Sequence, residues 1–153
     1  MRVRVIAVGT RMPEWVRSAC DAYLQRLRAL NVTLVQLEPL RRASAPARAT
    51  AAEGARLLGL LRPQEHVVAL DERGREFTTA EFALWLRARQ QGAQDLAFLI
   101  GGADGLAEAV LERADFTWSL SRLTLPHALA RVLLTEQLYR AHSILSNHPY
   151  HRA

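Results

Sequence analysis

Lysine is missing from this chain, so all 20 of its basic residues are arginines. A general preference of the genome for arginine explains this without any function. Arginine also suits phosphate, because the planar guanidinium group donates paired hydrogen bonds to phosphate oxygens. Basic residues outnumber acidic ones in residues 1–62, and residues 63–153 hold all five histidines. The net charge of +5 is compatible with RNA as a partner but does not identify one.

Cysteine is almost absent too. The single Cys20 cannot form an internal disulfide, which is typical of the reducing cytosol, so we expect a cytoplasmic protein. Cys20 lies in a helical pattern and is expected to be a small buried side chain rather than a nucleophile. The sequence also lacks the tight His and Cys spacing of a metal site, apart from His148 and His151, so no metal is expected.

Long apolar runs are missing as well. No run reaches the roughly 18 residues needed for a membrane-spanning helix, and the N-terminal residues lack the charged-then-apolar pattern of a signal peptide. Half of the residues are nevertheless hydrophobic, and 153 residues are enough to bury a core. We therefore expect no membrane partner and one globular domain spanning residues 1–153.

Short apolar runs bounded by Gly, Pro or Asp predict five strands, and helical spacing of apolar residues predicts five helices. The predicted strands span residues 2–8, 32–37, 66–70, 96–100 and 116–120. The predicted helices span residues 13–30, 50–62, 79–91, 106–114 and 126–146. Strict alternation predicts an α/β fold with a mostly parallel five-stranded sheet between helices. Strand 96–100 is the most apolar and is expected at the centre of the sheet.

Three connections carry more specific expectations. Residues 40–48 form a basic stretch without periodicity, which predicts a loop. Residues 72–77 predict a charged turn around Gly74. Thr79 is the expected N-cap of the helix that follows, and the residue three positions later is Phe82 rather than Glu, so no capping box is predicted.

A glycine-rich loop follows the central strand at once. It contains Gly101, Gly102 and Gly105, between a buried strand and a helix. In α/β proteins this is where ligands bind, outside the carboxyl ends of the strands. The spacing matches neither the dinucleotide fingerprint nor a phosphate-binding P-loop, and a tight turn without a ligand explains it equally well. Convergence with the strand end at Leu70 and the loop 121–126 would make one pocket.

Three motifs carry a resemblance to a known family. They are L-I-G-G-A-D-G at 99–105, S-R-L-T-L-P-H at 121–127 and N-H-P-Y-H-R at 147–152, with V-I-A-V-G-T at 5–10 as a weaker match. Their order, in a chain of this length, resembles the small SPOUT-superfamily methyltransferases that act on a pseudouridine of 23S ribosomal RNA. The family usually has Pro-Glu at positions 103 and 104, where this chain has Ala103 and Asp104.

The resemblance implies a deep trefoil knot near the C-terminus, a feature that general rules of chain connection disfavour. It also implies a homodimer, S-adenosylmethionine as the methyl donor, and a substrate within the large subunit or the whole ribosome. The cofactor would bind to residues of three loops. They are Leu70, Gly101, Gly102, Ser121, Arg122, Leu123, Thr124, Leu125 and Pro126.

Six side chains are the candidates for substrate contact and proton transfer at N3 of the base. They are His127, Arg131, His148, Tyr150, His151 and Arg152. A tyrosine can stack on a base, an arginine can pair with phosphate, and a histidine can accept a proton near neutral pH. The alternative for His127 is a packing residue without a role in catalysis. The alternative for the C-terminal tail, which carries His148, Tyr150, His151 and Arg152, is a free end without a function. On the family likeness, the tail is expected to serve the partner subunit.

Other functions fit parts of this pattern. The same fold could belong to a ribosome-binding or assembly protein without catalysis, or to a methyltransferase for another RNA such as a transfer RNA. The alternation of strands and helices alone also fits a flavodoxin-like nucleotide binder. Binding of S-adenosylmethionine would separate the first and last of these from a methyltransferase.

Overall fold

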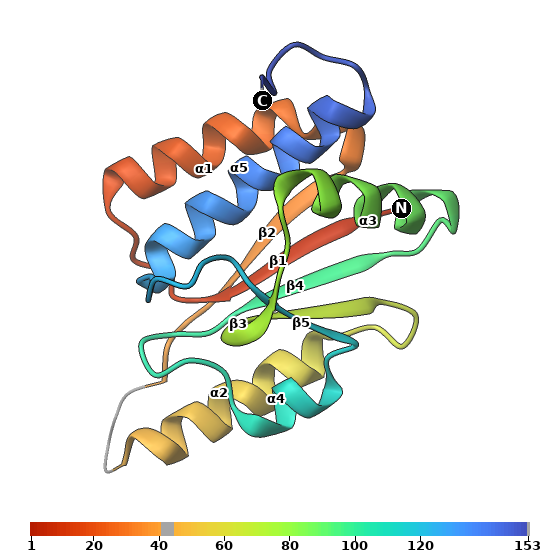
Figure 1. The fold of residues 1–153 in the computed structure, drawn as a ribbon. Coiled ribbons are helices and arrows are strands. Elements are labelled where there is room, and N and C mark those ends of the chain that lie inside the picture. Colours follow the sequence, from red (N-terminus) through yellow and green to blue (C-terminus); the bar gives the residue numbers. More distant parts are fainter. Residues whose placement is uncertain (41–44, 153) are drawn as a thin grey trace.

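The computed structural model describes residues 1–40 and 45–152, and these residues form five strands and five α-helices in alternation (Figure 1). The strands are β1 (Val3–Val8), β2 (Val32–Leu37), β3 (His66–Glu76), β4 (Leu96–Ile100) and β5 (Phe116–Ser119). The helices are α1 (Glu14–Arg26), α2 (Pro46–Leu60), α3 (Thr79–Gln91), α4 (Glu108–Arg113) and α5 (His127–Leu145). In this part of the chain, none of the helices is long and apolar enough to cross a membrane.

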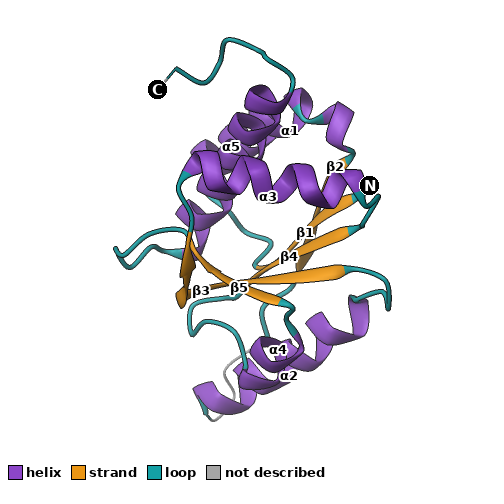
Figure 2. Cartoon of the chain, turned by 45° about the vertical axis from the view of Figure 1, so that its right-hand side comes forward, coloured by secondary structure: helices purple, strands orange, loops and turns teal. Residues whose placement is uncertain are grey.

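The sheet has the strand order β2-β1-β4-β3-β5, and all of its pairings are parallel. Helices α1, α3 and α5 cover one face, while α2 and α4 cover the other (Figure 2). All five residues of β4 are buried, as the apolar strand 96–100 predicted for a central position. The predicted α/β class with a parallel sheet between helices is therefore confirmed.

Each face of the sheet has its own apolar core. An aromatic group that includes Phe82, Phe98 and Trp118 lies under α3, with the rings of Phe82 and Trp118 stacked at 4.4 Å between centroids. On the opposite face, Ile6, Leu57 and other aliphatic residues pack beneath α2 and α4. Cys20 is 1% exposed, as expected from its helical position.

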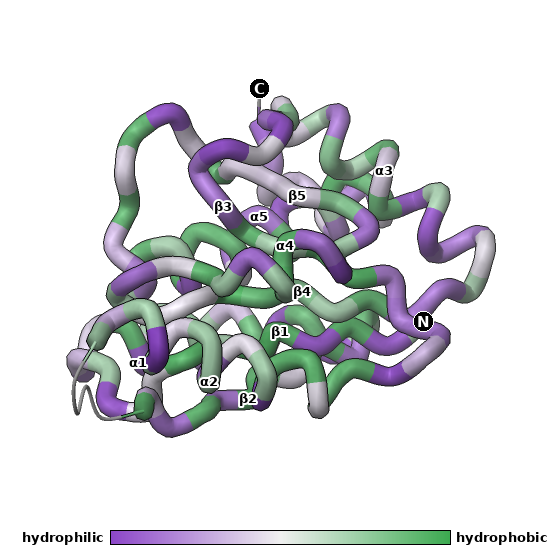
Figure 3. The backbone as a smooth tube through the Cα atoms, turned by 90° about the horizontal axis from the view of Figure 1, so that it is seen from below, coloured by the Kyte–Doolittle hydropathy of each residue, from purple (hydrophilic) through white to green (hydrophobic). Residues whose placement is uncertain are grey.

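The structure corrects three local expectations. Residues 72–76 continue β3 instead of forming a turn. Their charged side chains are accommodated because this second half of the strand is mostly exposed, and Figure 3 shows it as hydrophilic. In place of a turn, β3 has an irregularity in its pairing with β5, where the register shifts between Leu70 and Arg75. The N-cap of α3 is Thr78, not Thr79, and it forms a capping box with Glu81.

Two helix boundaries also differ from the prediction. Helix α2 begins at Pro46, four residues early, because proline is favoured in the first turn of a helix. Of the predicted basic loop 40–48, residues 41–44 lie outside the described residues. Helix α1 ends at Arg26, and a short 3-10 turn at Arg28–Leu30 leads to Asn31 in a left-handed conformation.

Candidate active site

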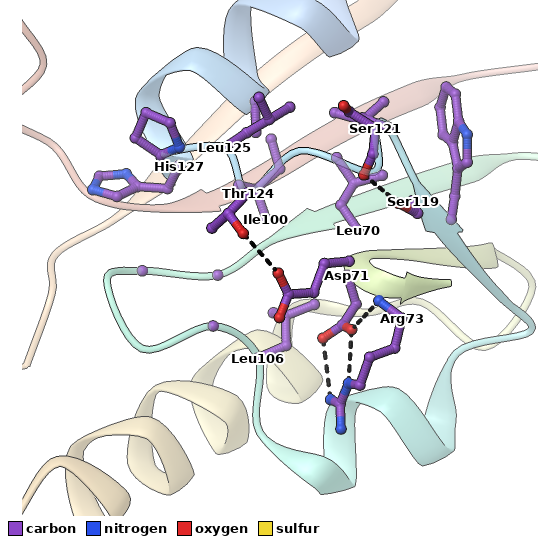
Figure 4. A pocket seen from close by; sticks show the side chains of 18 of the residues that line it. Leu70, Asp71, Arg73, Ile100, Leu106, Ser119, Ser121, Thr124, Leu125 and His127 are labelled. Carbon is purple, nitrogen blue, oxygen red and sulfur yellow. Dashed lines mark hydrogen bonds and ion pairs between the residues drawn. The ribbon is translucent and has the colours of Figure 1, made fainter. Parts of the chain in front are cut away.

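A cavity of about 960 Å³ opens at the carboxyl ends of β3, β4 and β5. Leu70, Ile100, Leu106 and Leu125 give it apolar walls (Figure 4). The three stretches that the sequence singled out, at Leu70, at 101–105 and at 121–126, all line it. The predicted convergence of three strand ends on one pocket is thus what the structure shows.

The glycine loop folds tightly back on itself at the cavity. The amide of Gly105 donates to the carbonyl of Gly102 at 3.1 Å, and Gly105 has a φ of +78°. A Cβ atom at Gly101 would lie 2.5 Å from the backbone of Gly105, which is closer than real Cβ contacts allow. Glycine is therefore required at position 101, because only glycine allows the two parts of the loop to approach this closely. The same close approach forms the tight turn and this wall of the cavity.

The loop 121–126 forms the facing wall and is held by its own polar side chains. The hydroxyl of Ser119 donates to the carbonyl of Ser121 at 2.8 Å, and the amide of Leu123 donates to the hydroxyl of Ser121 at 2.9 Å. Eight of the nine predicted cofactor-binding residues line the cavity. The exception is Arg122, whose side chain is 89% exposed and pairs with Glu76.

The middle of β3, just after its buried half, adds charge to the cavity. Asp71, Glu72 and Arg73 all line it. The Arg73 guanidinium donates to both carboxylate oxygens of Asp71, at 2.9 and 3.2 Å, and these hydrogen bonds hold the pKa of Asp71 below its ordinary value. Glu72 instead accepts a hydrogen bond from the Thr124 hydroxyl at 3.3 Å, which joins β3 to the facing loop.

His127, at the start of α5, is the one catalytic candidate that lines the cavity. Its Nδ1 atom is buried without a hydrogen-bond partner among the described residues. Burial, and secondarily the charge of Arg131, lower the pKa of His127, so its ring is neutral near pH 7 and can accept a proton.

Arg131 lies one turn further along α5 and is 1% exposed. Its guanidinium donates to the side-chain oxygen of Gln36 at 2.7 Å and to the carbonyl of Gly9 at 3.1 Å. Burial lowers the pKa of Arg131. The structure thus places it behind the cavity wall, joining α5 to the ends of β1 and β2, rather than in the lining.

The four C-terminal candidates lie at the other end of α5. The helix has 19 residues, so its ends are about 28 Å apart, and Figure 1 shows the C-terminal segment beyond the end that faces away from the cavity. His148 accepts a hydrogen bond from the Tyr150 amide at 3.3 Å, and Arg152 donates to the carbonyl of Pro149 at 3.4 Å. These side chains do not share a pocket with His127 in one subunit.

Tyr150 is the best-anchored residue of this tail. Its ring lies 4.5 Å from that of Tyr139, and the Arg140 guanidinium lies 4.8 Å from its centroid. Its hydroxyl donates to Glu136 at 3.2 Å and lies 3.5 Å from the hydroxyl of Tyr23. Burial, and then the hydrogen bond with Tyr23, raise the pKa of Tyr150, so the phenol keeps its proton.

Comparison with known proteins agrees with this architecture. A model of the family described as "Predicted SPOUT methyltransferase" matches residues 1–151. The chain belongs to the SPOUT methyltransferase family. Curated relatives named "Ribosomal RNA large subunit methyltransferase H" include one from Methylobacillus flagellatus, 45% identical over 99% of both chains, and one from Burkholderia mallei, 50% identical over 100% of both.

Solved structures show the same fold at lower identity. A probable methyltransferase from Bordetella pertussis superposes with a TM-score of 0.62 at 24% identity, over 92% of this chain and 93% of that one. A probable methylase family protein from Haemophilus influenzae gives a TM-score of 0.59 at 16% identity, over 99% of this chain and 70% of that one.

The cavity of this SPOUT methyltransferase fits S-adenosylmethionine in size and chemistry. Its volume lies in the range of about 300–1,000 Å³ that is usual for small-molecule sites. The apolar walls suit a purine ring, the tightly turned glycine loop exposes backbone groups, and the carboxylates suit a cation. Among the described residues, no group of three or more His, Cys, Asp or Glu side chains is placed to hold a metal ion.

Sequence reasoning missed two groups of residues in this SPOUT methyltransferase. Glu72 was assigned to a turn, although its position just beyond the strand end at Leu70 was a usable signal. Glu136 and Arg140 are the second group, and they hold the tail. Arg140 donates to Glu136 at 2.8 Å and lies 3.5 Å from His151. Their i,i+4 spacing on a helix is typical of such a pair.

Proposed function

We propose that this chain methylates N3 of a pseudouridine in 23S ribosomal RNA, on assembled ribosomes in the cytoplasm, with S-adenosylmethionine as the donor. The observation that carries the proposal is the cavity of about 960 Å³ in which three motif segments meet. The names of relatives that are 45% and 50% identical over their full length support ribosomal RNA as the substrate.

Bound S-adenosylmethionine supplies a methyl group that is already electrophilic, because it is attached to a sulfonium. The protein then has to hold the methyl carbon in line with N3 and exclude water from the approach. The residues of the three loops would hold this donor, which would supply the methyl group to N3, and a group of the protein would have to accept the N3 proton. His127 is our candidate for the proton acceptor, because it lines the cavity and its lowered pKa keeps the ring uncharged, and so free to take a proton, at neutral pH.

The cofactor would be held by residues from all three walls. We assign this role to the eight residues indicated by the family likeness that line the cavity. They are Leu70, Gly101, Gly102, Ser121, Leu123, Thr124, Leu125 and Pro126. Arg131 supports this wall from behind through Gly9 and Gln36. We also propose that residues 1–153 form one domain, in which loop 121–126 and α5 complete a trefoil knot.

The active unit in this proposal is a homodimer in which the tail of one subunit reaches the cavity of the other. The structure supports it in one respect, since none of the four C-terminal candidates lines the cavity of its own subunit. Tyr150 would stack on a base, Arg152 would pair with phosphate, and His148 and His151 would donate or accept protons beside the substrate.

Mass spectrometry of 23S ribosomal RNA tests the function directly. A strain that lacks this protein should lose a single methyl group from a pseudouridine-containing fragment, and a plasmid copy of the chain should restore it. An unchanged RNA mass in the deletion strain would contradict the proposal. Such a result, combined with a failure to bind S-adenosylmethionine, would favour the assembly role, and a lost methyl group in a transfer RNA would identify another substrate.

A further inference from the structure

We propose that the Glu72 carboxylate makes this pocket select the cationic methyl donor over its neutral demethylated product. The inference rests on the proposed use of S-adenosylmethionine and adds a residue that determines which form of the cofactor stays bound. It starts from the charge of the lining, where Asp71, Glu72 and Asp104 contribute three carboxylates and Arg73 contributes one guanidinium.

On the β3 side of the cavity, the pairing among these groups leaves Glu72 as the carboxylate that does not share the Arg73 guanidinium through a hydrogen bond. Asp71 and Arg73 neutralise one another, because the guanidinium donates to both carboxylate oxygens of Asp71. The pKa of Arg73 is raised mainly by this hydrogen bond, while the charge of Glu72 is among the smallest of the contributing causes. Within the described part of the chain, the hydrogen bond that Glu72 accepts comes from a neutral hydroxyl, that of Thr124.

The position of Glu72 places this charge between two walls of the cavity. It follows Leu70 and Asp71 at the carboxyl end of the buried half of β3, and it reaches loop 121–126 through Thr124. Figure 4 shows the resulting contact as a dashed line from Thr124 across to the β3 side. The Glu72 carboxylate therefore interacts electrostatically with a ligand that occupies the space between β3 and loop 121–126.

Electrostatics then separates donor from product. S-adenosylmethionine carries a sulfonium, an ammonium and a carboxylate, so its net charge is +1, whereas S-adenosylhomocysteine lacks the sulfonium charge and is neutral. A negative lining attracts the first more strongly than the second, and the rest of the two molecules is nearly identical. Glu72 is solvent-exposed, so screening limits the effect to a few-fold difference in affinity. The same difference favours release of the product after methyl transfer.

Calorimetric titration with the two ligands isolates this effect. Glu72→Gln keeps an oxygen that can accept from Thr124 but removes the charge. We expect it to weaken S-adenosylmethionine binding about three- to tenfold and to change S-adenosylhomocysteine binding less than twofold. The matched control is Glu76→Gln, because Glu76 is an exposed acid on the same strand that pairs with Arg122 outside the cavity lining, and it should leave both affinities unchanged.

Two further measurements keep the test decisive. Thr124→Val removes the hydrogen bond to Glu72 but retains the Glu72 carboxylate. It should therefore change the affinities for the two ligands by the same factor and leave their ratio unchanged. Raising the salt concentration on the wild-type protein should reduce its preference for the cationic ligand. An unchanged ratio of the two affinities in Glu72→Gln would overturn this inference and leave the methyltransferase proposal intact, whereas a folded wild-type protein that binds neither ligand would overturn both.

Discussion

The two ends of helix α5 differ in what holds them and in what they offer a ligand. At its N-terminal end, Pro126 and His127 join backbone loops that are fixed by glycine geometry and by short polar contacts. At its C-terminal end, a tail of single side chains rests on the helix through Tyr150. The first end contributes to a cavity of mostly backbone and apolar walls, and the second carries the four C-terminal candidates, none of which lines that cavity.

This difference suggests a division of work. A cofactor pocket benefits from a rigid backbone, because the methyl group must be held in line with its acceptor. A substrate-contacting tail can be held weakly, because it has to rearrange around RNA. The Tyr150 side chain makes one ring pair, one cation–π contact and two hydroxyl hydrogen bonds, all with side chains, and new contacts to a base could replace them.

The largest effect is expected from Gly101→Ala. Its new Cβ atom would lie 2.5 Å from the backbone of Gly105, so the loop has to open and the cavity wall moves. We expect S-adenosylmethionine affinity to fall by about 100-fold or more, because the ligand loses the backbone groups of an entire wall. Isothermal calorimetry measures the affinity, and far-ultraviolet circular dichroism checks that the variant is folded.

Gly59→Ala is the matched control for this substitution. A Cβ atom at Gly59 meets nothing within 4 Å, and the residue lies inside α2, where alanine is favoured over glycine by about 0.5–1 kcal/mol. The control should bind like the wild type and be slightly more stable. Equal binding by both variants would mean that the glycine loop is not a wall of the cofactor site.

A smaller effect, but a more specific one, is expected from mixing two defective subunits. Gly101→Ala damages the cavity, and deletion of residues 149–153 removes the tail, so each homodimer should be inactive. A mixed dimer has one intact cavity facing one intact tail. Random pairing makes half of the dimers mixed, each with one of its two sites working, so methyl transfer should recover to about a quarter of the wild-type level.

The mixture needs a control in which both defects are in one chain. Pairing that double variant with the wild type leaves an intact cavity only opposite a missing tail, so its mixed dimers should be inactive. Random pairing also leaves a quarter of the control dimers fully wild type, so the control has to be measured on purified mixed dimers. Activity in those dimers, or a lack of recovery in verified mixed dimers of the two single variants, would contradict a site shared between subunits.

Much of the fold was predictable from local patterns. The apolar run 96–100 marked the central strand, because a strand buried on both faces in a parallel sheet lacks polar alternation. The capping of α3 was missed by one residue, because both Thr78 and Thr79 can cap and only the position of Glu81 decides between them. The second half of β3 was missed because its charged residues look like a turn until β5 supplies a partner.

The candidate site was predictable to a different degree at its two ends. Strand ends of a parallel sheet must meet at one edge, so the three wall segments could be expected to converge without knowledge of distances. No such rule places the tail, because its position depends on long side chains at Tyr23, Glu136 and Arg140 that come from two helices. Periodicity assigned Arg131 a face of α5, but its burial against Gly9 and Gln36 depends on contacts with β1 and β2.

The smallest effect is expected at Tyr150 and concerns stability rather than cofactor binding. Tyr150→Ala removes the contacts with Tyr139 and Arg140, so the free energy of unfolding should fall by about 1–2 kcal/mol. Tyr150→Phe keeps the ring and loses only the hydroxyl's hydrogen bonds with Glu136 and Tyr23, which should cost about 1 kcal/mol. Urea denaturation measures both changes.

These two Tyr150 variants also sharpen the difference between the ends of α5. S-adenosylmethionine affinity of the free protein should be unchanged in both, because Tyr150 does not line the cavity of its own subunit. Methyl transfer to ribosomes should fall in Tyr150→Ala and be largely retained in Tyr150→Phe, since stacking on a base requires the ring and not the hydroxyl. Equal loss of activity in the two variants would instead assign the hydroxyl, rather than the ring, to the substrate.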